Sequence, residues 1–277
     1  MKNYADVIKA YDEGRYWQTE IRKVSGSCPP QAHFDLSYTG GQPMPNYYAS
    51  EPLVMMALNG NKGIYKGIDT TSKKYIHKLC FSTFVSNMTT PIISILDYIA
   101  YVPFVDLDST DEQFVENIPL PRFTDGQGLR LMAILQGSGT GLPNLTIRYI
   151  NQDGIESTTT TLVTTQYTAG SLMHSIPSNN AGRAWINLAK GDTGIRSIVS
   201  VKSSLATGAI CALVIVKPIC EITVAEYLTP IEIDFLAYKT RLPEIHRDAY
   251  LNMILFNNNT ASYLTPNIVG YINFIWE

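Results

Sequence analysis

Five carboxylates fall within residues 101–117, YVPFVDLDSTDEQFVEN, and this density suggests a metal or catalytic site. An EF-hand calcium loop has Gly at its sixth position and Glu at its twelfth. Counted from Asp106, these positions hold Asp111 and Asn117, so the EF-hand pattern does not fit. A looser calcium or magnesium site that combines Asp106, Asp108 and a distant ligand stays an alternative.

The order of residues in this acidic run favours a solvated turn over a metal site. Residues 108–112, DSTDE, carry the Asp and Ser/Thr side chains that hydrogen-bond to nearby backbone in turns. Either Ser109 or Thr110 could also cap a short helix, with Asp111, Glu112 and Glu116 following. The acidic run is therefore predicted to be structural, with no metal bound.

Other catalytic motifs are missing from the sequence. No two of the four histidines are close in sequence, and none lies in an H-E-x-x-H motif: His33, His77, His174 and His246. There is no G-x-S-x-G motif, and the glycine-rich loop at 137–143 lacks the lysine of a phosphate-binding loop. A carboxylate pair for glycoside hydrolysis stays open, because such pairs meet only in space; the first suspects are Asp106, Asp108, Asp125 and Asp153. We predict no enzymatic activity and no cofactor.

Composition points to a β-rich chain. Of 277 residues only 16% are charged, Tyr is abundant at 17, and the net charge of −3 comes without a basic patch. Nucleic acid is therefore not the expected partner. No apolar run is long enough to cross a bilayer, and no secretory signal is recognisable. Four scattered cysteines without a C-x-x-C pattern predict reduced, mostly buried thiols.

The predicted elements are mostly strands. Residues 3–13 have helical spacing and end at Gly14, and 91–101 are a second predicted helix with Pro at its first position. Short strands are predicted at 75–85, 129–135, 145–150, 159–165, 183–188, 195–203, 209–216, 250–256 and 268–276. Asp153-Gly154 predicts a hairpin, and 195–203 with 209–216 is interpreted as another. This spacing predicts a mostly β fold, a β-sandwich or jelly roll.

The N-terminal 60 residues look different from the rest. Pro and Gly interrupt residues 25–60, yet aromatic residues and Met are interleaved with them. We predict an N-terminal helix and extended arm at 1–60, followed by a β-sandwich domain at 61–277 whose C-terminal strands complete the sheet. A long loop that wraps its own domain is the alternative, and both descriptions can hold together.

Several segments together resemble virion structural proteins of tailed bacteriophages: AYDEGRYWQTEIRKVSG, GGQPMPNYYASEPL, NKGIYKGI, LDYIAYVPFVDLDSTDEQ, IPLPRFTDGQGLRLM and RYINQDG. The resemblance covers most of the chain and is specific as a set. Such proteins are typically non-enzymatic and either decorate or cement the head or build neck and tail parts. It implies a virion component, assembled in the cytoplasm of a host bacterium, whose partners are the major capsid protein or other virion proteins. No functional residue can be transferred from it individually.

We accordingly predict a homo-oligomeric cement or decoration protein whose arm contacts neighbouring subunits through Trp17, Phe34, Tyr47 and Tyr48. Aromatic side chains supply interface area, and few charges need to be desolvated. A neck, tail or fibre component is the alternative. A carbohydrate-binding β-sandwich and a polysaccharide hydrolase remain the other classes.

Overall fold

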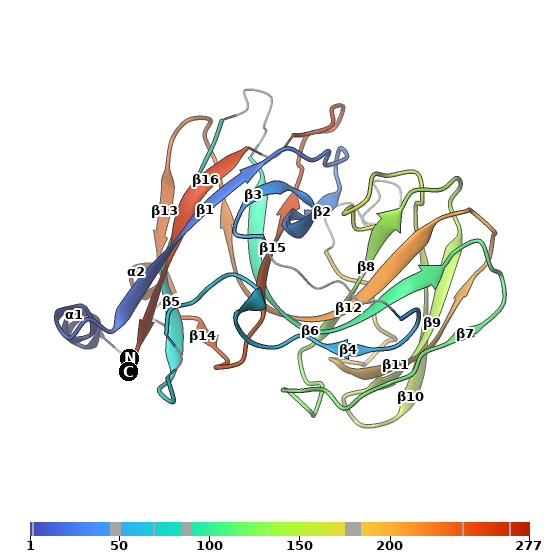
Figure 1. The fold of residues 1–277 in the computed structure, drawn as a ribbon, viewed down its shortest axis with the longest axis horizontal. Helices are drawn as coiled ribbons and strands as arrows, with labels where there is room; N and C mark the ends of the chain where they lie inside the picture. Colours follow the sequence, from blue (N-terminus) through green and yellow to red (C-terminus); the bar gives the residue numbers. More distant parts are fainter. Residues whose placement is uncertain are drawn as a thin grey trace.

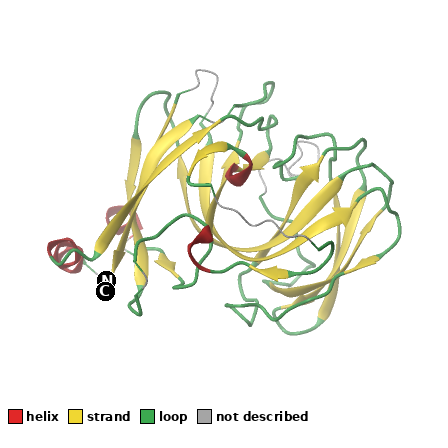
Figure 2. Cartoon of the chain, in the orientation of Figure 1, coloured by secondary structure: helices red, strands yellow, loops and turns green. Residues whose placement is uncertain are grey.

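The computed structural model describes residues 1, 3–44, 51–68, 70–84, 90–174, 184–239, 241–265 and 267–277. Strands dominate these residues (Figure 2). The described helices are α1 (Tyr4–Asp12) and α2 (Phe235–Lys239), with 3-10 turns η1 (Leu36–Tyr38) and η2 (Gly60–Lys62). None of the helices in this part of the chain is long and apolar enough to span a membrane.

The strands form three sheets, in which every pairing between named strands is antiparallel. The terminal sheet has the order β13 (Ile231–Asp234), β5 (Lys74–Thr83), β16 (Ile268–Trp276), β1 (Tyr16–Val24), β3 (Gly40–Gln42), and β14 (Glu244–Ile245) also pairs with β5. The central sheet has the order β2 (His33–Asp35), β15 (Leu251–Phe256), β6 (Ile92–Asp106), β12 (Ile210–Thr223), β8 (Arg130–Gly137), and β4 (Met56–Ala57) also pairs with β6. The distal sheet has the order β10 (Glu156–Leu162), β9 (Asn144–Asn151), β11 (Ile195–Ser203), β7 (Gln113–Phe114).

The two long strands β6 and β12 join two hydrophobic cores (Figure 1). Ile93 and Ile95 at the start of β6 belong to the core that the central sheet shares with the terminal sheet. Ile99 and Val105 further along β6 belong to the core that it shares with the distal sheet. Each fully buried side chain of this kind stabilises the fold by roughly 1.5–3 kcal/mol. The molecule is therefore two β-sandwiches built on one shared sheet.

A third cluster covers the opposite face of the central sheet. It contains alternate residues of the same strands, among them Leu96 and Tyr98 of β6 and Val214 and Val216 of β12. Most of β6, and β12 as far as Val216, are thus buried on both faces, which explains why these segments are apolar without alternation.

The mostly β prediction and most predicted strands are confirmed. The Asp153-Gly154 turn does join β9 and β10 as a hairpin, with Gly154 at φ 79°. Gly14, at φ 68°, follows α1 as predicted. Cys28, Cys211 and Cys220 are buried thiols outside any disulfide, and Cys80 is half-buried.

Three predictions about elements are wrong. The predicted helix at 91–101 is a strand from residue 92 onward, part of β6, because an apolar run buried on both faces has no helical stripe. Residues 195–203 and 209–216 do not form a hairpin, since β11 pairs in the distal sheet and β12 in the central sheet. Of 183–188, the described residues 184–188 form only an isolated bridge, Leu131 with Ile186.

Residues 1–60 contribute strands to two sheets. β1 runs antiparallel to β16 over eight paired positions and also pairs with β3, while β2 pairs with β15 and β4 with β6. The stretch from 16 to 42 therefore supplies strands to both the terminal and the central sheet. It runs along the outside of the domain and is also part of its sheets.

Candidate functional site

The structure separates the four predicted interface residues. Trp17, near the start of β1, is 40% exposed. Phe34 in β2 is only 1% exposed. It packs in the core between the central and terminal sheets, so its own chain covers it. Tyr47 and Tyr48 lie outside the described residues. Of the four, Trp17 is the residue that the structure presents on the surface.

Trp17 is the centre of an exposed apolar patch, here called the Trp17 patch. Its ring packs edge-on against Tyr65 at a centroid distance of 5.2 Å, and its indole nitrogen donates to Thr19 Oγ1 at 3.1 Å. A Cβ on Gly67 would lie 2.8 Å from Trp17 Cβ, so glycine permits this close approach. Ile68, which follows Gly67, is 59% exposed. Sequence reasoning found Trp17 but missed its partners fifty residues away.

A second apolar patch, the α1 patch, is formed by Tyr4 and Ile8. Asn3 caps this helix by accepting a hydrogen bond from the Asp6 amide at 3.0 Å. Val7 is buried, whereas Tyr4 and Ile8 are 51% and 59% exposed. The helical spacing predicted one apolar stripe, and only part of that stripe packs on the body. Figure 1 places α1 and the start of β1 at the same end of the molecule.

A hydroxyl, an imidazole and a carboxylate line up behind α1. The Tyr11 hydroxyl lies 3.0 Å from His77 Nδ1, and His77 Nε2 lies 3.4 Å from Asp234 Oδ2. Burial raises the pKa of Tyr11 and lowers the pKa of His77. The phenol therefore keeps its proton near neutral pH and is a poor nucleophile. The arrangement acts as a tether that holds α1 against β5 and β13.

The acidic run folds as a turn after β6. Asp106 Oδ1 accepts from the Asp108 amide at 2.8 Å, and Asp108 Oδ1 accepts from the Gly208 amide at 3.0 Å. Glu112 accepts from Arg148 at 2.7 Å, and hydrogen bonds from Ser200 and Arg148 lower its pKa. In the described part of the chain no three His, Cys, Asp or Glu residues are placed to hold a metal ion. These contacts agree with the predicted turn chemistry.

Two carboxylates of this run are left without partners. Asp111 and Glu116 are exposed, and neither carboxylate forms an ion pair or hydrogen bond with a described residue. Between them in β7 lies Phe114, which is 62% exposed. The run thus presents an aromatic ring flanked by two uncompensated negative charges, here called the acidic knob.

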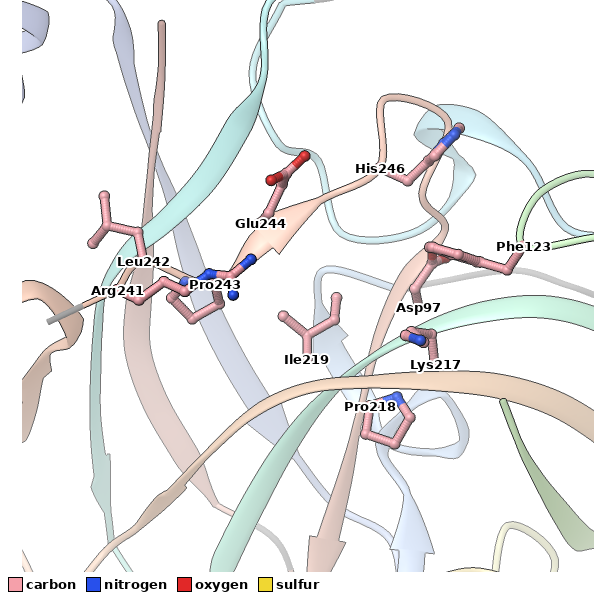
Figure 3. A pocket seen from close by; sticks show the side chains of 10 residues that line it. All are labelled: Asp97, Phe123, Lys217, Pro218, Ile219, Arg241, Leu242, Pro243, Glu244 and His246. Atoms are coloured by element: carbon pink, nitrogen blue, oxygen red, sulfur yellow. The ribbon is translucent and has the colours of Figure 1, made fainter. Parts of the chain in front are cut away.

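A cleft of about 620 Å³ lies at the junction of the two sandwiches (Figure 3). One wall is the segment from Arg241 to Glu244, which enters β14, and Phe123 and His246 stand on the opposite side. Ile219, Pro218, Lys217 and Asp97, all from the central sheet, lie between the two walls. Sequence reasoning missed this cleft, because its residues come from four distant segments without a shared motif.

The lining of the cleft is apolar, with two acids and two cations at its edges. Its two acids are already paired: Asp97 with Arg122, and Glu244 with Lys73 at 3.2 Å. Lys217 Nζ donates to the Gln127 carbonyl at 3.0 Å and lies 5.1 Å from the centre of the Phe123 ring, but no described carboxylate lies within 4.0 Å of it. Arg241 is exposed and has no ion pair or hydrogen bond within the described residues. Such a site favours binding of an anionic, partly apolar partner.

One lining residue of the cleft, Asp97, belongs to a buried ion pair with Arg122. The Asp97 and Arg122 side chains are 2% and 1% exposed. Arg122 Nε donates to Asp97 Oδ2 at 2.8 Å, and its other nitrogens donate to the Leu58 and Tyr98 carbonyls, both at 2.7 Å. Asp97 also accepts from the Tyr250 amide at 2.9 Å. This fully bonded pair joins four segments where the two cores meet.

The chain has only distant similarity to solved structures. No family model matches the chain, and no curated protein matches it. One similar solved chain comes from the structure of the infectious bursal disease virus Gt strain, with 10% identity over 95% of this chain and 80% of that chain, at a TM-score of 0.17. Another is the infectious bursal disease virus VP2 subviral particle, with 12% identity over 95% of this chain and 42% of that one, at a TM-score of 0.14. At these TM-scores no conclusion about fold or function follows from either.

Proposed function

We propose that this chain is a non-enzymatic structural protein of a virus particle that binds neighbouring shell subunits and stabilises the head. The observation that carries the proposal is the pair of exposed apolar patches, one formed by Trp17, Tyr65 and Ile68 and the other by Tyr4 and Ile8. Their elements α1 and the start of β1 lie at the same end of the molecule (Figure 1). Exposed aromatic and aliphatic groups of this kind are typical of binding surfaces. The resemblance of the sequence to tailed-phage virion proteins supports the same function.

The absence of enzymatic activity is part of the proposal. The hydroxyl–imidazole–carboxylate chain of Tyr11, His77 and Asp234 is not poised for nucleophilic chemistry, because burial raises the pKa of the phenol further above its ordinary value. Its role as a tether also fits a structural protein, since it fixes the helix that carries the α1 patch.

Quantitative mass spectrometry of gradient-purified phage particles tests the location. A copy number close to that of the major shell protein is expected for a cement or decoration protein. A small fixed number would replace head decoration by a neck, tail or fibre position. Absence from purified particles would contradict the proposal as a whole.

The binding surface is tested by adding the purified chain to particles that lack it. Ile68→Ser and Ile8→Ser each place a hydroxyl in one apolar patch, and Ile155→Ser is the matched control, because Ile155 is 63% exposed but lies in the β9–β10 turn. Loss of a central interface side chain typically costs about 2 kcal/mol, or roughly 30-fold in affinity. If both patch variants bound particles as well as Ile155→Ser does, these patches would not be the binding surface.

A further inference from the structure

We infer that two copies of this chain bind each other by inserting the acidic knob of one into the cleft of the other. The knob is Phe114 with Asp111 and Glu116, and the cleft is the apolar site that carries Lys217 and Arg241. The inference does not rest on the proposed particle role, because both surfaces belong to this chain.

Charge complementarity is the first argument. Among the described residues, two cations of the cleft have no acidic partner, Lys217 and Arg241, since Arg122 and Lys73 already neutralise its two acids. The knob has two carboxylates, Asp111 and Glu116, for which the described part of the chain offers no cationic partner. Unlike charges that are uncompensated on separate surfaces attract and orient two molecules at physiological ionic strength over about 8 Å.

The apolar groups match as well. Phe114 is 62% exposed at the centre of the knob. The cleft offers Phe123, Ile219 and Pro243 as apolar lining between its two walls. An aromatic anchor that fills an apolar pocket, with charged groups around it, is the usual arrangement of a strong protein interface.

The sizes are also compatible. Asp111 and Glu116 are five residues apart, so their backbones are separated by at most about 17 Å when extended. The cleft holds about 620 Å³, within the range of about 300–1,000 Å³ for sites that enclose a compact group. One aromatic side chain and its adjoining backbone fit such a space.

A chain cannot fill its own cleft with its own knob. β7, which carries Phe114, lies at the far end of the distal sheet, whereas β14, which forms one wall of the cleft, belongs to the terminal sheet (Figure 1). The contact therefore forms between copies. Because the two surfaces differ, it either repeats reciprocally in a two-fold dimer or runs head to tail into a ring or filament.

Charge exchange tests the inference. One variant carries Asp111→Lys and Glu116→Lys, and a second carries Lys217→Glu and Arg241→Glu. Each alone opposes like charges at the contact, so sedimentation velocity should show at least a tenfold weaker self-association than the parent chain. Mixed in equal amounts, they offer a basic knob to an acidic cleft and an acidic knob to a basic cleft, so association should return. Lys9→Glu on α1 is the charge-reversal control and should associate like the parent.

Circular dichroism and thermal unfolding are recorded for every variant, and only variants that retain the fold of the parent enter the comparison. Association of the parent chain should also weaken when salt is raised, because screening acts on the same charges. A parent chain that stays monomeric up to hundreds of micromolar would overturn the inference. So would a mixture of the two folded variants that fails to associate while the parent does.

Discussion

The buried pair of Asp97 and Arg122 should be the most sensitive polar contact in the fold. Asp97→Asn keeps the shape of the side chain but removes its charge, and it leaves the Arg122 guanidinium buried at 1% exposure without a counter-ion. The amide nitrogen of Asn would also face guanidinium N–H groups, so one acceptor becomes a donor.

The magnitude follows from the burial of both partners. Breaking a buried ion pair by removing one partner costs about 3–5 kcal/mol. Urea unfolding with an m-value of about 3 kcal/mol/M converts this loss into a midpoint lower by about 1–1.7 M. Glu112→Gln, which breaks the exposed pair with Arg148, is the control, and its midpoint should stay close to that of the parent.

A double-mutant cycle isolates the pair. Arg122→Met should also be strongly destabilising, since it strands the Asp97 carboxylate. Asp97→Asn combined with Arg122→Met removes both charges, so the double variant should lose clearly less than the sum of the two single losses. Additive losses, or an Asp97→Asn midpoint no lower than that of Glu112→Gln, would refute the view that this pair is a coupled, desolvated unit.

Two further predictions concern stability. Lys23 is fully buried, its amine has no hydrogen-bond partner among the described residues, and burial lowers its pKa from 10.5 to about 8 despite the nearby Asp35. Between pH 8 and 10.5 the unfolded chain binds more protons than the folded chain, so this lysine makes native stability rise with pH. Lys23→Met should therefore raise the urea midpoint at pH 7, and the gain should shrink towards pH 10. An added Cβ at Gly194 would lie 1.9 Å from the Gly126 carbonyl oxygen, so Gly194→Ala should lower the thermal midpoint by about 4–8 °C. Gly137→Ala, which meets nothing within 4 Å, should leave that midpoint nearly unchanged.

Local signals predicted those elements that local physics decides. The Asp153-Gly154 turn needs a positive φ at Gly154 and a backbone twist that matches the flanking strands. The Asp-Gly dipeptide favours both. The α1 helix likewise follows from its cap and its apolar spacing. Residues 92–106 gave the wrong element, because burial of both faces erases the period that separates strand from helix.

The sequence does not reveal which distant strands and which distant charged residues pair with each other. These pairings determine both the fold and the charge of the cleft. The turn near Gly208 has the residue types of a hairpin turn, yet it connects two facing sheets. β11 pairs with β9 in the distal sheet, whereas β12 pairs with β6 in the central sheet. Lys217 and Asp97 are directly paired across β12 and β6, yet Arg122 takes the carboxylate and leaves Lys217 without an acid. Whether a charged side chain is left without an ion-pair partner, and so can bind another molecule, depends on which neighbours the fold brings close to it. The acidic run from 106 to 116 illustrates the same point: Asp106, Asp108 and Glu112 accept hydrogen bonds within the fold, and the two carboxylates without a described partner, Asp111 and Glu116, are the ones that the proposed contact between copies uses.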